Sequence, residues 1–271
     1  MPPVSPAPRL YCPGPLTARA VHTLPAGAAR HAQVLRLQPG DALVLFDGTG
    51  GEWDARVTRM GRSEVLVEPL LHRAVEREAA RHVHLAAACI AAERMDWLVE
   101  KATELGASGI TPLMAGRSAA RFGAERAERR LAHWRAIAQA ACEQCGRNRL
   151  PQIEPVRNLA DWLTAIATRP AQRGALVAPD SGDTAARHGT RANGELRLLL
   201  SLRPGAAALG IAAGNVATVT LLSGPEGGFS PDEEAAAQAA GFRPVTLGER
   251  VLRAETAPLA ALAALAALML C

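Results

Sequence analysis

Lysine and aromatic residues are scarce in this chain of 271 residues. Lys101 is the single lysine, so almost all of the 30 basic residues are arginines. Aromatic side chains make up only 3% of the chain, which leaves few platforms on which a nucleic-acid base could stack. The formal net charge of +4 is compatible with a nucleic-acid partner without requiring one. The arginine bias suits contacts to phosphates and bases, although GC-rich codon usage is the simpler explanation.

The sequence also shows no pattern typical of a metal site, a secretory leader or a membrane span. Cys142 and Cys145 form an isolated C-x-x-C pair, and without a second pair of ligands no metal site is expected. The five cysteines are predicted to be free thiols in a reducing compartment. The start of the chain has no apolar segment of the kind found in secretory signals, which favours a cytoplasmic protein. The apolar run from Leu259 to Leu270 is only about a dozen residues, too short to cross a bilayer, and predicts a buried helix.

A phosphate-binding loop is absent too, although one segment has its outline. Residues 219–234 predict a buried strand, a glycine loop and a helix in succession. The segment has neither Gly-Lys-Ser/Thr nor G-x-G-x-x-G spacing. Pro225 lacks a donor N–H, and the carboxylate of Glu226 would repel a pyrophosphate. A carboxylate in this loop instead suits a ligand with positive charge or hydroxyl groups, such as S-adenosylmethionine (SAM). A tight turn with a solvent-facing Glu226 is the alternative.

Two helix starts and a group of charges mark the C-terminal part of the chain. Ser230 and Glu233 form an S-x-x-E capping box, with proline at the first helical position. Thr256 is placed to cap the terminal helix. Arg250, Arg253 and Glu255 lie just before it, interleaved with apolar residues. They form either a surface salt-bridge cluster or, because their neighbours should be core, a buried functional cluster.

The first part of the chain predicts a small β-rich module. Short alternating segments joined by glycine-containing turns are typical of an antiparallel meander or barrel. A charged stretch from His72 to Arg81 follows and predicts a linker. The predicted strands are Ala42–Asp47, Glu52–Arg59 and Glu64–Glu68, preceded by a helix over Ala28–Leu37.

From His82 onward, apolar strands alternate with helical segments. This alternation predicts an α/β domain with a largely parallel sheet. Ser181–Asn193 is polar and predicts a loop. The predicted strands are His84–Ala91, Ile110–Leu113, Leu176–Ala178, Leu196–Leu202, Ala217–Leu222 and Pro244–Leu247, with helices over Arg94–Leu105 and Ala124–Cys145.

Several motifs, taken in order, make the chain similar to a known family. The sequence SGPEGGFS begins at Ser223, and LGERVLRAETA begins at Leu247. Earlier in the chain lie Arg9-Leu10-Tyr11, the stretch from Arg30 to Arg36, WLVEKATELG from Trp97, and EQCGRN from Glu143. Together they resemble the 16S rRNA (uracil(1498)-N(3))-methyltransferase family of the SPOUT superfamily.

The resemblance implies a fold, a cofactor and a partner. Residues 1–72 are expected to form a PUA-like RNA-binding β-barrel, and residues 73–271 a SPOUT-type α/β domain with a parallel sheet and a C-terminal trefoil knot. The implied activity is SAM-dependent methylation of N3 of a uridine in 16S ribosomal RNA of the small subunit. A homodimer without metal or membrane is also implied.

The sequence also allows other functions. The chain could act on another RNA, such as tRNA, or be a non-catalytic RNA-binding assembly factor. A nucleotide-dependent α/β enzyme is disfavoured because the phosphate-binding signatures are missing.

The family reading assigns residues to the chemistry. Methylation of N3 requires removal of its proton and stabilisation of the resulting anion, which suits a base and nearby arginines. Glu143 and Arg147 are four residues apart and are expected on one helix face, unless they are an ordinary surface pair. The catalytic candidates are Glu143, Arg147, Arg253 and Glu255, and the identity of the base is left open.

Binding residues follow from the same resemblance. The cofactor-binding candidates are Leu222, Ser223, Gly224, Pro225, Glu226, Gly227, Gly228, Leu247, Gly248, Val251, Leu252, Arg253, Thr256 and Ala257. The RNA-binding candidates are Arg9, Arg30, His31, Arg36, Arg117 and Arg121. N3 lies on the Watson–Crick edge, so the target base must be unpaired or extruded. Tyr11, Phe46 and Phe122 are the candidate stacking residues, although each also suits core packing.

Overall fold

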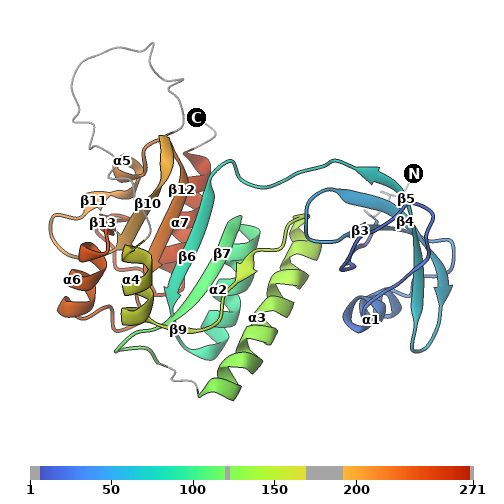
Figure 1. The fold of residues 1–271 in the computed structure, drawn as a ribbon, viewed down its shortest axis with the longest axis horizontal. Coiled ribbons are helices and arrows are strands. Elements are labelled where there is room, and N and C mark those ends of the chain that lie inside the picture. The colour runs from blue at the N-terminus through green and yellow to red at the C-terminus, as the bar shows by residue number, and fades with distance from the viewer. Residues whose placement is uncertain (1–6, 120–122, 169–191, 269–271) are drawn as a thin grey trace, which may run out of the picture. The chain divides into compact units, whose positions relative to one another are not determined.

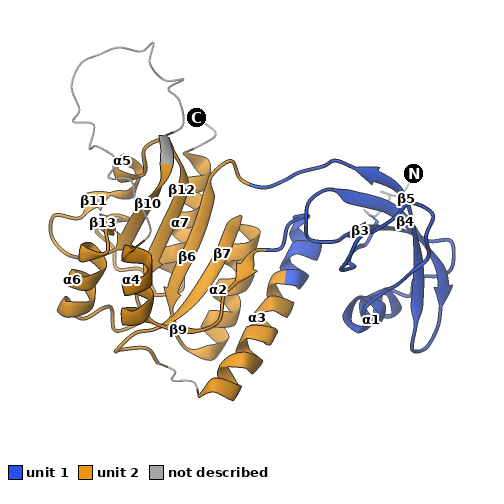
Figure 2. Ribbon diagram, viewed as in Figure 1, with its two compact units in different colours: residues 1–78, 139–150 blue, residues 79–138, 151–271 orange. Residues whose placement is uncertain are grey.

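The computed structural model describes residues 7–119, 123–168 and 192–268, and its contacts divide the chain into two units. The first unit comprises residues 1–78 and 139–150, and the second comprises residues 79–138 and 151–271 (Figure 2). None of the helices within the described ranges is both long enough and apolar enough to cross a membrane.

The first unit contains a five-stranded sheet in the order β1-β3-β4-β5-β2, of which Figure 1 labels β3, β4 and β5. The strands β3, β4 and β5 pair in antiparallel fashion, which confirms the predicted meander, and β1 adds to β3 in parallel. Leu43, Leu45 and Val67 alternate inward and are almost fully buried. The elements are β1 (Arg9–Tyr11), β2 (His22–Thr23), α1 (Ala26–Val34), β3 (Ala42–Phe46), β4 (Glu52–Met60) and β5 (Val65–Arg73).

The boundary of the predicted linker was wrong at its start. The sequence predicts a linker from His72, but β5 continues to Arg73 because it pairs with the beginning of β4, where Glu52 lies opposite Arg73. Arg73 thus belongs to a strand, where it forms an ion pair with Asp54.

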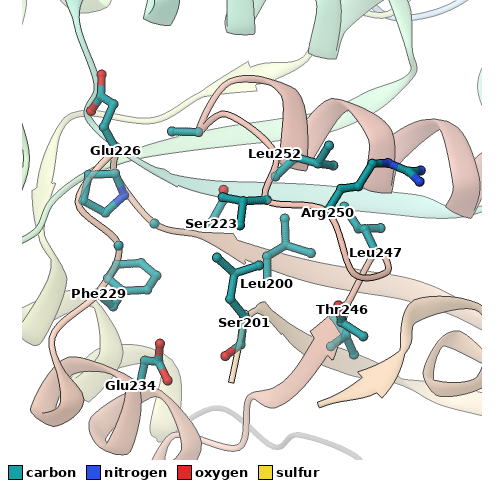
Figure 3. A pocket seen from close by; sticks show the side chains of 18 of the residues that line it. Leu200, Ser201, Ser223, Glu226, Phe229, Glu234, Thr246, Leu247, Arg250 and Leu252 are labelled. Carbon is teal, nitrogen blue, oxygen red and sulfur yellow. The ribbon is translucent and has the colours of Figure 1, made fainter. Parts of the chain in front are cut away.

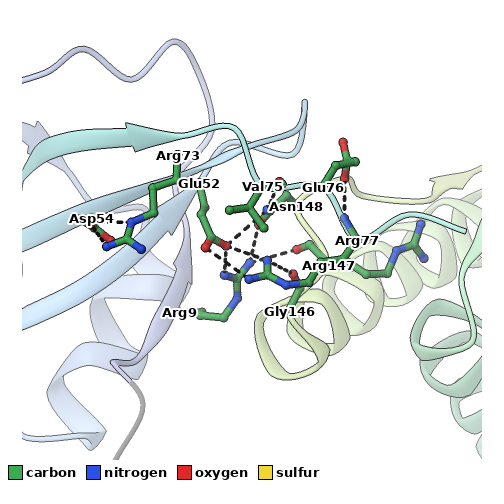
Figure 4. Close-up of polar contacts among 10 residues, drawn as sticks. All are labelled: Arg9, Glu52, Asp54, Arg73, Val75, Glu76, Arg77, Gly146, Arg147 and Asn148. Carbon is green, nitrogen blue, oxygen red and sulfur yellow. Dashed lines mark hydrogen bonds and ion pairs between the residues drawn. The ribbon is translucent and has the colours of Figure 1, made fainter.

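An ion network joins distant segments of the first unit (Figure 4). Glu52 accepts hydrogen bonds from Arg9 at 2.6 Å and from Arg77 at 2.8 Å. Arg9 also donates to the side-chain oxygen of Asn148 at 2.6 Å, and Asn148 donates to the Val75 carbonyl at 2.8 Å. The hydrogen bond from Arg77, together with the one from Arg9, lowers the pKa of Glu52 from 4.5 to about 2 despite its burial. The network therefore ties segment 139–150 to the β-sheet of the same unit.

The second unit is built on a wholly parallel sheet. Its main strand order is β11-β13-β10-β12-β6-β7-β8, and β9 pairs with β7 (Figure 1). This arrangement confirms the predicted α/β class. The strands are β6 (His82–Ala88), β7 (Ala107–Met114), β8 (Gln152–Ile153), β9 (Arg157–Asn158), β10 (Ala192–Leu200), β11 (Ala207–Ala208), β12 (Val216–Ser223) and β13 (Arg243–Thr246).

Helices cover both faces of this sheet. Successive strand residues point to opposite faces. Leu198 and Leu221 pack in a core with α2, α5, α7 and part of α3, whereas Leu199 and Leu222 pack in a core with α4 and α6. The helices are α2 (Ala92–Glu104), α3 (Ala124–Cys145), α4 (Leu159–Ala167), α5 (Leu209–Ala213), α6 (Pro231–Ala239) and α7 (Thr256–Ala267).

Some local predictions differ from the structure. The predicted strand Leu176–Ala178 and most of the predicted loop Ser181–Asn193 lie outside the described residues. Asn193 itself belongs to β10 because this strand already pairs with β12 from Ala192. The predicted cap Thr256 is the first helical residue of α7, so Glu255 holds the N-cap position.

Candidate functional site

A pocket opens at the carboxyl ends of three neighbouring parallel strands of the second unit, β13, β10 and β12 (Figure 3). Ligand sites of open parallel sheets occur at this edge. The strand ends supply Leu200, Thr246 and Ser223 to its lining. Two loops complete it, the glycine loop of residues 224–229 after β12 and the second loop of residues 247–255 after β13.

Glycines give the first of these loops its tight path. Gly228 has a φ of +65°, a conformation that residues with a side chain rarely adopt. Its N–H donates to the Pro225 carbonyl at 2.9 Å, which closes the turn. A Cβ at Gly224 would lie 3.2 Å from the buried ring of Phe229. The loop therefore brings its backbone to the pocket wall with little room for side chains.

The helix after the glycine loop starts as predicted. The side chain of Ser230 accepts from the Glu233 N–H at 3.2 Å, and Glu233 accepts from the Ser230 N–H at 2.8 Å. This reciprocal pair is the predicted capping box, with Pro231 at the start of α6. Glu233 also accepts from the Gly116 N–H at 2.7 Å, so the capping box anchors the loop that follows β7.

Glu226 belongs to the lining of the pocket, but its carboxylate is hydrogen-bonded to a neighbouring element. Its carboxylate accepts a hydrogen bond from the Ala91 N–H at 3.1 Å, at the start of α2. It also lies 3.7 Å from Arg94, and Arg94 lies 3.8 Å from Glu255. Figure 3 shows the Glu226 carboxylate pointing away from Leu200 and Ser201. Arg94 thus stands between carboxylates of the glycine loop and the second loop.

A second carboxylate, that of Glu234, also lines the pocket. Glu234 lies in α6, is 9% exposed and forms an ion pair with Arg203. Arg250 is the basic residue in the lining, and it is exposed. Much of the remaining lining is apolar and includes Leu200, Leu247 and Leu252. A ligand with a flat apolar part and a positively charged or hydroxylated part suits these walls better than a polyphosphate does.

Most of the predicted cofactor-binding residues line this one pocket, and a few do not. Leu222 faces the core beneath α4 and α6, and the Gly227 carbonyl accepts a hydrogen bond from Arg117 at 2.9 Å. The residues found in the lining are Ser223, Gly224, Pro225, Glu226, Gly228, Leu247, Gly248, Val251, Leu252 and Ala257, whereas Leu222, Gly227, Arg253 and Thr256 are not among them.

The predicted catalytic residues fall in both units. In the first unit, Glu143 accepts from the Tyr11 N–H at 3.0 Å and lies 3.1 Å from His31. Arg147 is 4% exposed and forms an ion pair with Glu78. The expectation that Glu143 and Arg147 share a helix face was wrong, because α3 ends at Cys145 and Gly146 turns the chain with a φ of +87°.

The two remaining catalytic candidates lie in the second loop. Arg253 is exposed, and its carbonyl accepts from the N–H groups of Thr256 and Ala257, both at 2.9 Å. Glu255 is 7% exposed, so the predicted C-terminal charge group is partly buried rather than wholly on the surface.

The predicted RNA-binding residues have different surroundings. Arg30, His31 and Arg36 are exposed on the first unit. The Arg9 side chain is 14% exposed and is held in the ion network with Glu52. Arg117 is exposed in the second unit, and Arg121 lies outside the described residues.

Sequence reasoning missed several residues of the pocket. The segment Leu196–Leu202 was predicted as a strand, but its last residues were not connected with the site. The rule that ligands bind at the carboxyl ends of parallel strands would have selected them. No sequence motif marks Glu234 as a pocket residue. It directly follows the capping box in the first turn of α6, next to Asp232 and Glu233. The missed lining residues are Leu200, Ser201, Leu202, Phe229, Glu234, Val245, Thr246 and Ala254.

Known proteins share both units of the chain. A model of the RNA methyltransferase domain matches residues 77–266, and a model of the RNA methyltransferase PUA domain matches residues 24–70. Ribosomal RNA small subunit methyltransferase E of Synechocystis sp. is 31% identical over 88% of this chain and 69% of its own length. The protein of the same name from Mycobacterium bovis is also 31% identical, over 88% of this chain and 82% of its own.

Solved structures show the same fold. A crystal structure of ribosomal RNA small subunit methyltransferase E from Neisseria gonorrhoeae, bound to SAM, is 34% identical to this chain. The TM-score is 0.82, and the match covers 95% of this chain and 96% of the other.

Proposed function

Because the chain belongs to the RNA methyltransferase family that includes ribosomal RNA small subunit methyltransferase E, we propose that it transfers the methyl group of SAM to N3 of a uridine in 16S ribosomal RNA. The observation that carries this proposal is the pocket formed by the glycine loop and the second loop at the strand ends of the second unit. The SAM-bound relative from Neisseria gonorrhoeae supports the choice of cofactor.

The lining of the pocket fits SAM. Leu200, Leu247 and Leu252 offer apolar surface for an adenine ring. Glu234 offers a carboxylate to hydroxyl or ammonium groups. Backbone groups of the glycine loop lie at the wall, where Gly224 leaves no side chain in the way. When bound, SAM supplies an activated methyl group on a sulfonium. The protein's own task is then to align the acceptor and exclude water.

The acceptor nitrogen sets the remaining chemical requirements. N3 of uracil carries a proton at neutral pH, so a base must take it and cationic groups must stabilise charge on the neighbouring oxygens. Arg253 and Glu255 lie in the second loop beside the pocket and are the second unit's candidates for these tasks. Glu143 and Arg147 remain candidates from the first unit, but their partners His31 and Glu78 also give them structural tasks.

The chain's other expected properties complete the proposal. Residues 1–72 are proposed to bind RNA, with Arg30, His31 and Arg36 as exposed contacts. Residues 73–271 are proposed to form the catalytic domain, whose C-terminal segment forms a trefoil knot. A cytoplasmic homodimer that acts on the small ribosomal subunit is part of the same proposal.

Methyl transfer to isolated small subunits tests the function. Subunits from a strain without this enzyme are incubated with the protein and SAM that carries a labelled methyl group. Nucleoside mass spectrometry should then find one 3-methyluridine in 16S ribosomal RNA. Label in tRNA alone would favour another RNA substrate, and calorimetry without SAM binding would contradict the enzyme proposal.

A further inference from the structure

A second pocket lies beside the pocket proposed to bind SAM (the cofactor pocket) in the same unit. It is lined by Glu93, Arg94, Trp97, Glu255 and Thr256. We propose that this pocket receives the target uracil, with Trp97 as its stacking surface and Glu255 as the acceptor of its N3 proton, which presupposes the proposed function. Neither Trp97 nor Arg94 was a candidate from the sequence.

The two pockets are neighbours through named residues. Arg94 lies 3.7 Å from Glu226, a residue of the cofactor pocket, and 3.8 Å from Glu255 of the second pocket. Thr256 lines the second pocket, and the next residue, Ala257, lines the cofactor pocket. A base in the second pocket would therefore lie close to a donor in the first, as in-line transfer requires.

Glu255 has an unsatisfied oxygen. The residue is 7% exposed, and among the described residues no group forms a hydrogen bond with its Oε2 atom. The 3.8 Å between Oε1 and the Arg94 Nε atom exceeds a hydrogen-bond distance. A buried carboxylate without a donor is unfavourable, and such groups in native proteins call for a partner. The N–H at position 3 of uracil is a donor of the required kind.

Trp97 and Arg94 suit the rest of the base. Trp97 is 44% exposed, although large aromatic side chains are usually buried, and it can present a face to a flat ring. The side chain of Arg94 is 43% exposed, so its guanidinium can reach O2 or O4 of the base. By contrast, the earlier stacking candidate Phe46 is completely buried. The second pocket thus combines a stacking surface, a cation and an acceptor.

Every bond and electron pair is accounted for in the proposed methyl transfer to N3. The Glu255 carboxylate takes the N3 proton, and the electron pair left on N3 forms the new bond to the methyl carbon. The bond between that carbon and sulfur breaks, and its electron pair stays on sulfur, which becomes a neutral thioether. Arg94 stabilises the negative charge that develops on the pyrimidine oxygens.

The first experiment compares Glu255→Gln with Glu249→Gln, a carboxylate of the same loop that lines neither pocket. Glu255→Gln should lower the single-turnover rate by about 10²- to 10⁴-fold. Its Kd for SAM, measured by calorimetry, should stay within about threefold of the wild type. Its residual rate should rise by about tenfold per pH unit, because hydroxide then removes the proton. Glu249→Gln should match the wild type in every respect.

The second experiment does not depend on turnover. RNA with 5-iodouridine at the target position is irradiated in the presence of the protein, and the crosslinked peptide is identified by mass spectrometry. The crosslink should lie on Trp97. Trp97→Ala should lose it and weaken RNA binding on the order of tenfold, while Trp97→Phe retains most of the affinity.

Two results would overturn this assignment while leaving the proposed function intact. One is a wild-type rate and pH profile for Glu255→Gln. The other is a crosslink confined to residues outside the second pocket, with normal RNA affinity for Trp97→Ala. If the wild-type protein itself fails to methylate small subunits, the proposed function falls as well.

Discussion

Glu52 is the side chain on which the ion network of the first unit depends. Replacing Glu52 with Gln leaves Arg9 and Arg77 facing each other without a carboxylate between them. We expect a loss of about 1–3 kcal/mol in the free energy of unfolding at pH 7, measured by urea denaturation. Glu64→Gln removes an exposed pair with Arg59 and should change this free energy by less than about 1 kcal/mol. Equal losses for both variants would contradict the role of the network.

The same carboxylate predicts a pH dependence. The pKa of Glu52 is lowered from 4.5 to about 2, so its ionised form is the one that the folded state favours. Its stabilising contribution is complete above about pH 4.5 and is lost as the pH falls through about 2. The difference in melting temperature between the wild type and Glu52→Gln should therefore shrink between these two pH values. A difference that does not change over this interval would show that Arg77 and Arg9 do not lower the pKa of Glu52.

Arg147 tests whether a family motif serves catalysis or structure. It is 4% exposed and paired with Glu78 within the first unit, so Arg147→Ala leaves a carboxylate without its partner. We expect a destabilisation of about 3–5 kcal/mol, visible in thermal and urea unfolding. If the variant unfolds like the wild type but methylates RNA more slowly, the catalytic assignment from the sequence is the better one.

The glycine loop is the element that shapes the pocket proposed to bind SAM. An alanine Cβ at position 224 would lie 3.2 Å from the Phe229 ring and 3.4 Å from the Phe229 nitrogen. The ring or the loop must shift, and we expect the Kd for SAM to rise by about tenfold in calorimetry. Gly210→Ala is the matched control, because a Cβ there meets no atom within 4 Å and lies in helix α5. The prediction fails if Gly224→Ala binds SAM as tightly as Gly210→Ala does.

Elements with local signals were predictable from the sequence. The capping box of Ser230 and Glu233 and the strand before the glycine loop depend on neighbouring residues, and the structure contains both. The resemblance of the two loops to those of a known family located most of the lining of the pocket proposed to bind SAM. The Leu200–Leu202 wall, Glu234 and Trp97 were missed because their roles depend on which elements become neighbours in space.

Contacts between distant segments could not be predicted. The Asn148 side chain donates to Glu52 at 3.3 Å across 96 positions of the chain. Neither hydrophobic periodicity nor a turn motif in the sequence indicates such a pair. The interpretation of Glu143 and Arg147 as a pair on one helix face therefore overlooked that α3 ends at Cys145 and that the next residues belong to the unit with the β-sheet.

For the molecule as a whole, the net charge of +4 and the exposed arginines predict salt-sensitive RNA binding. The logarithm of the binding constant should fall linearly with the logarithm of the salt concentration. Arg30→Ala should reduce the magnitude of this slope by roughly one. Arg56→Ala is the control, because that guanidinium already pairs with Glu68. Filter binding from low to moderate salt measures both variants, and identical slopes would exclude Arg30 as a phosphate contact.

The first unit is built from two separate segments of the chain, and this has a consequence for biosynthesis. Residues 139–150 belong to it, although the whole of β6 and β7 lies earlier in the chain. A nascent polypeptide released as far as residue 78 lacks Asn148. The hydrogen bonds that join Asn148 to Arg9 and Glu52 therefore cannot form yet. They form only after much of the second unit has been translated, and an excised fragment of residues 1–78, which keeps the core of the sheet, should be less stable than the same unit in the full chain.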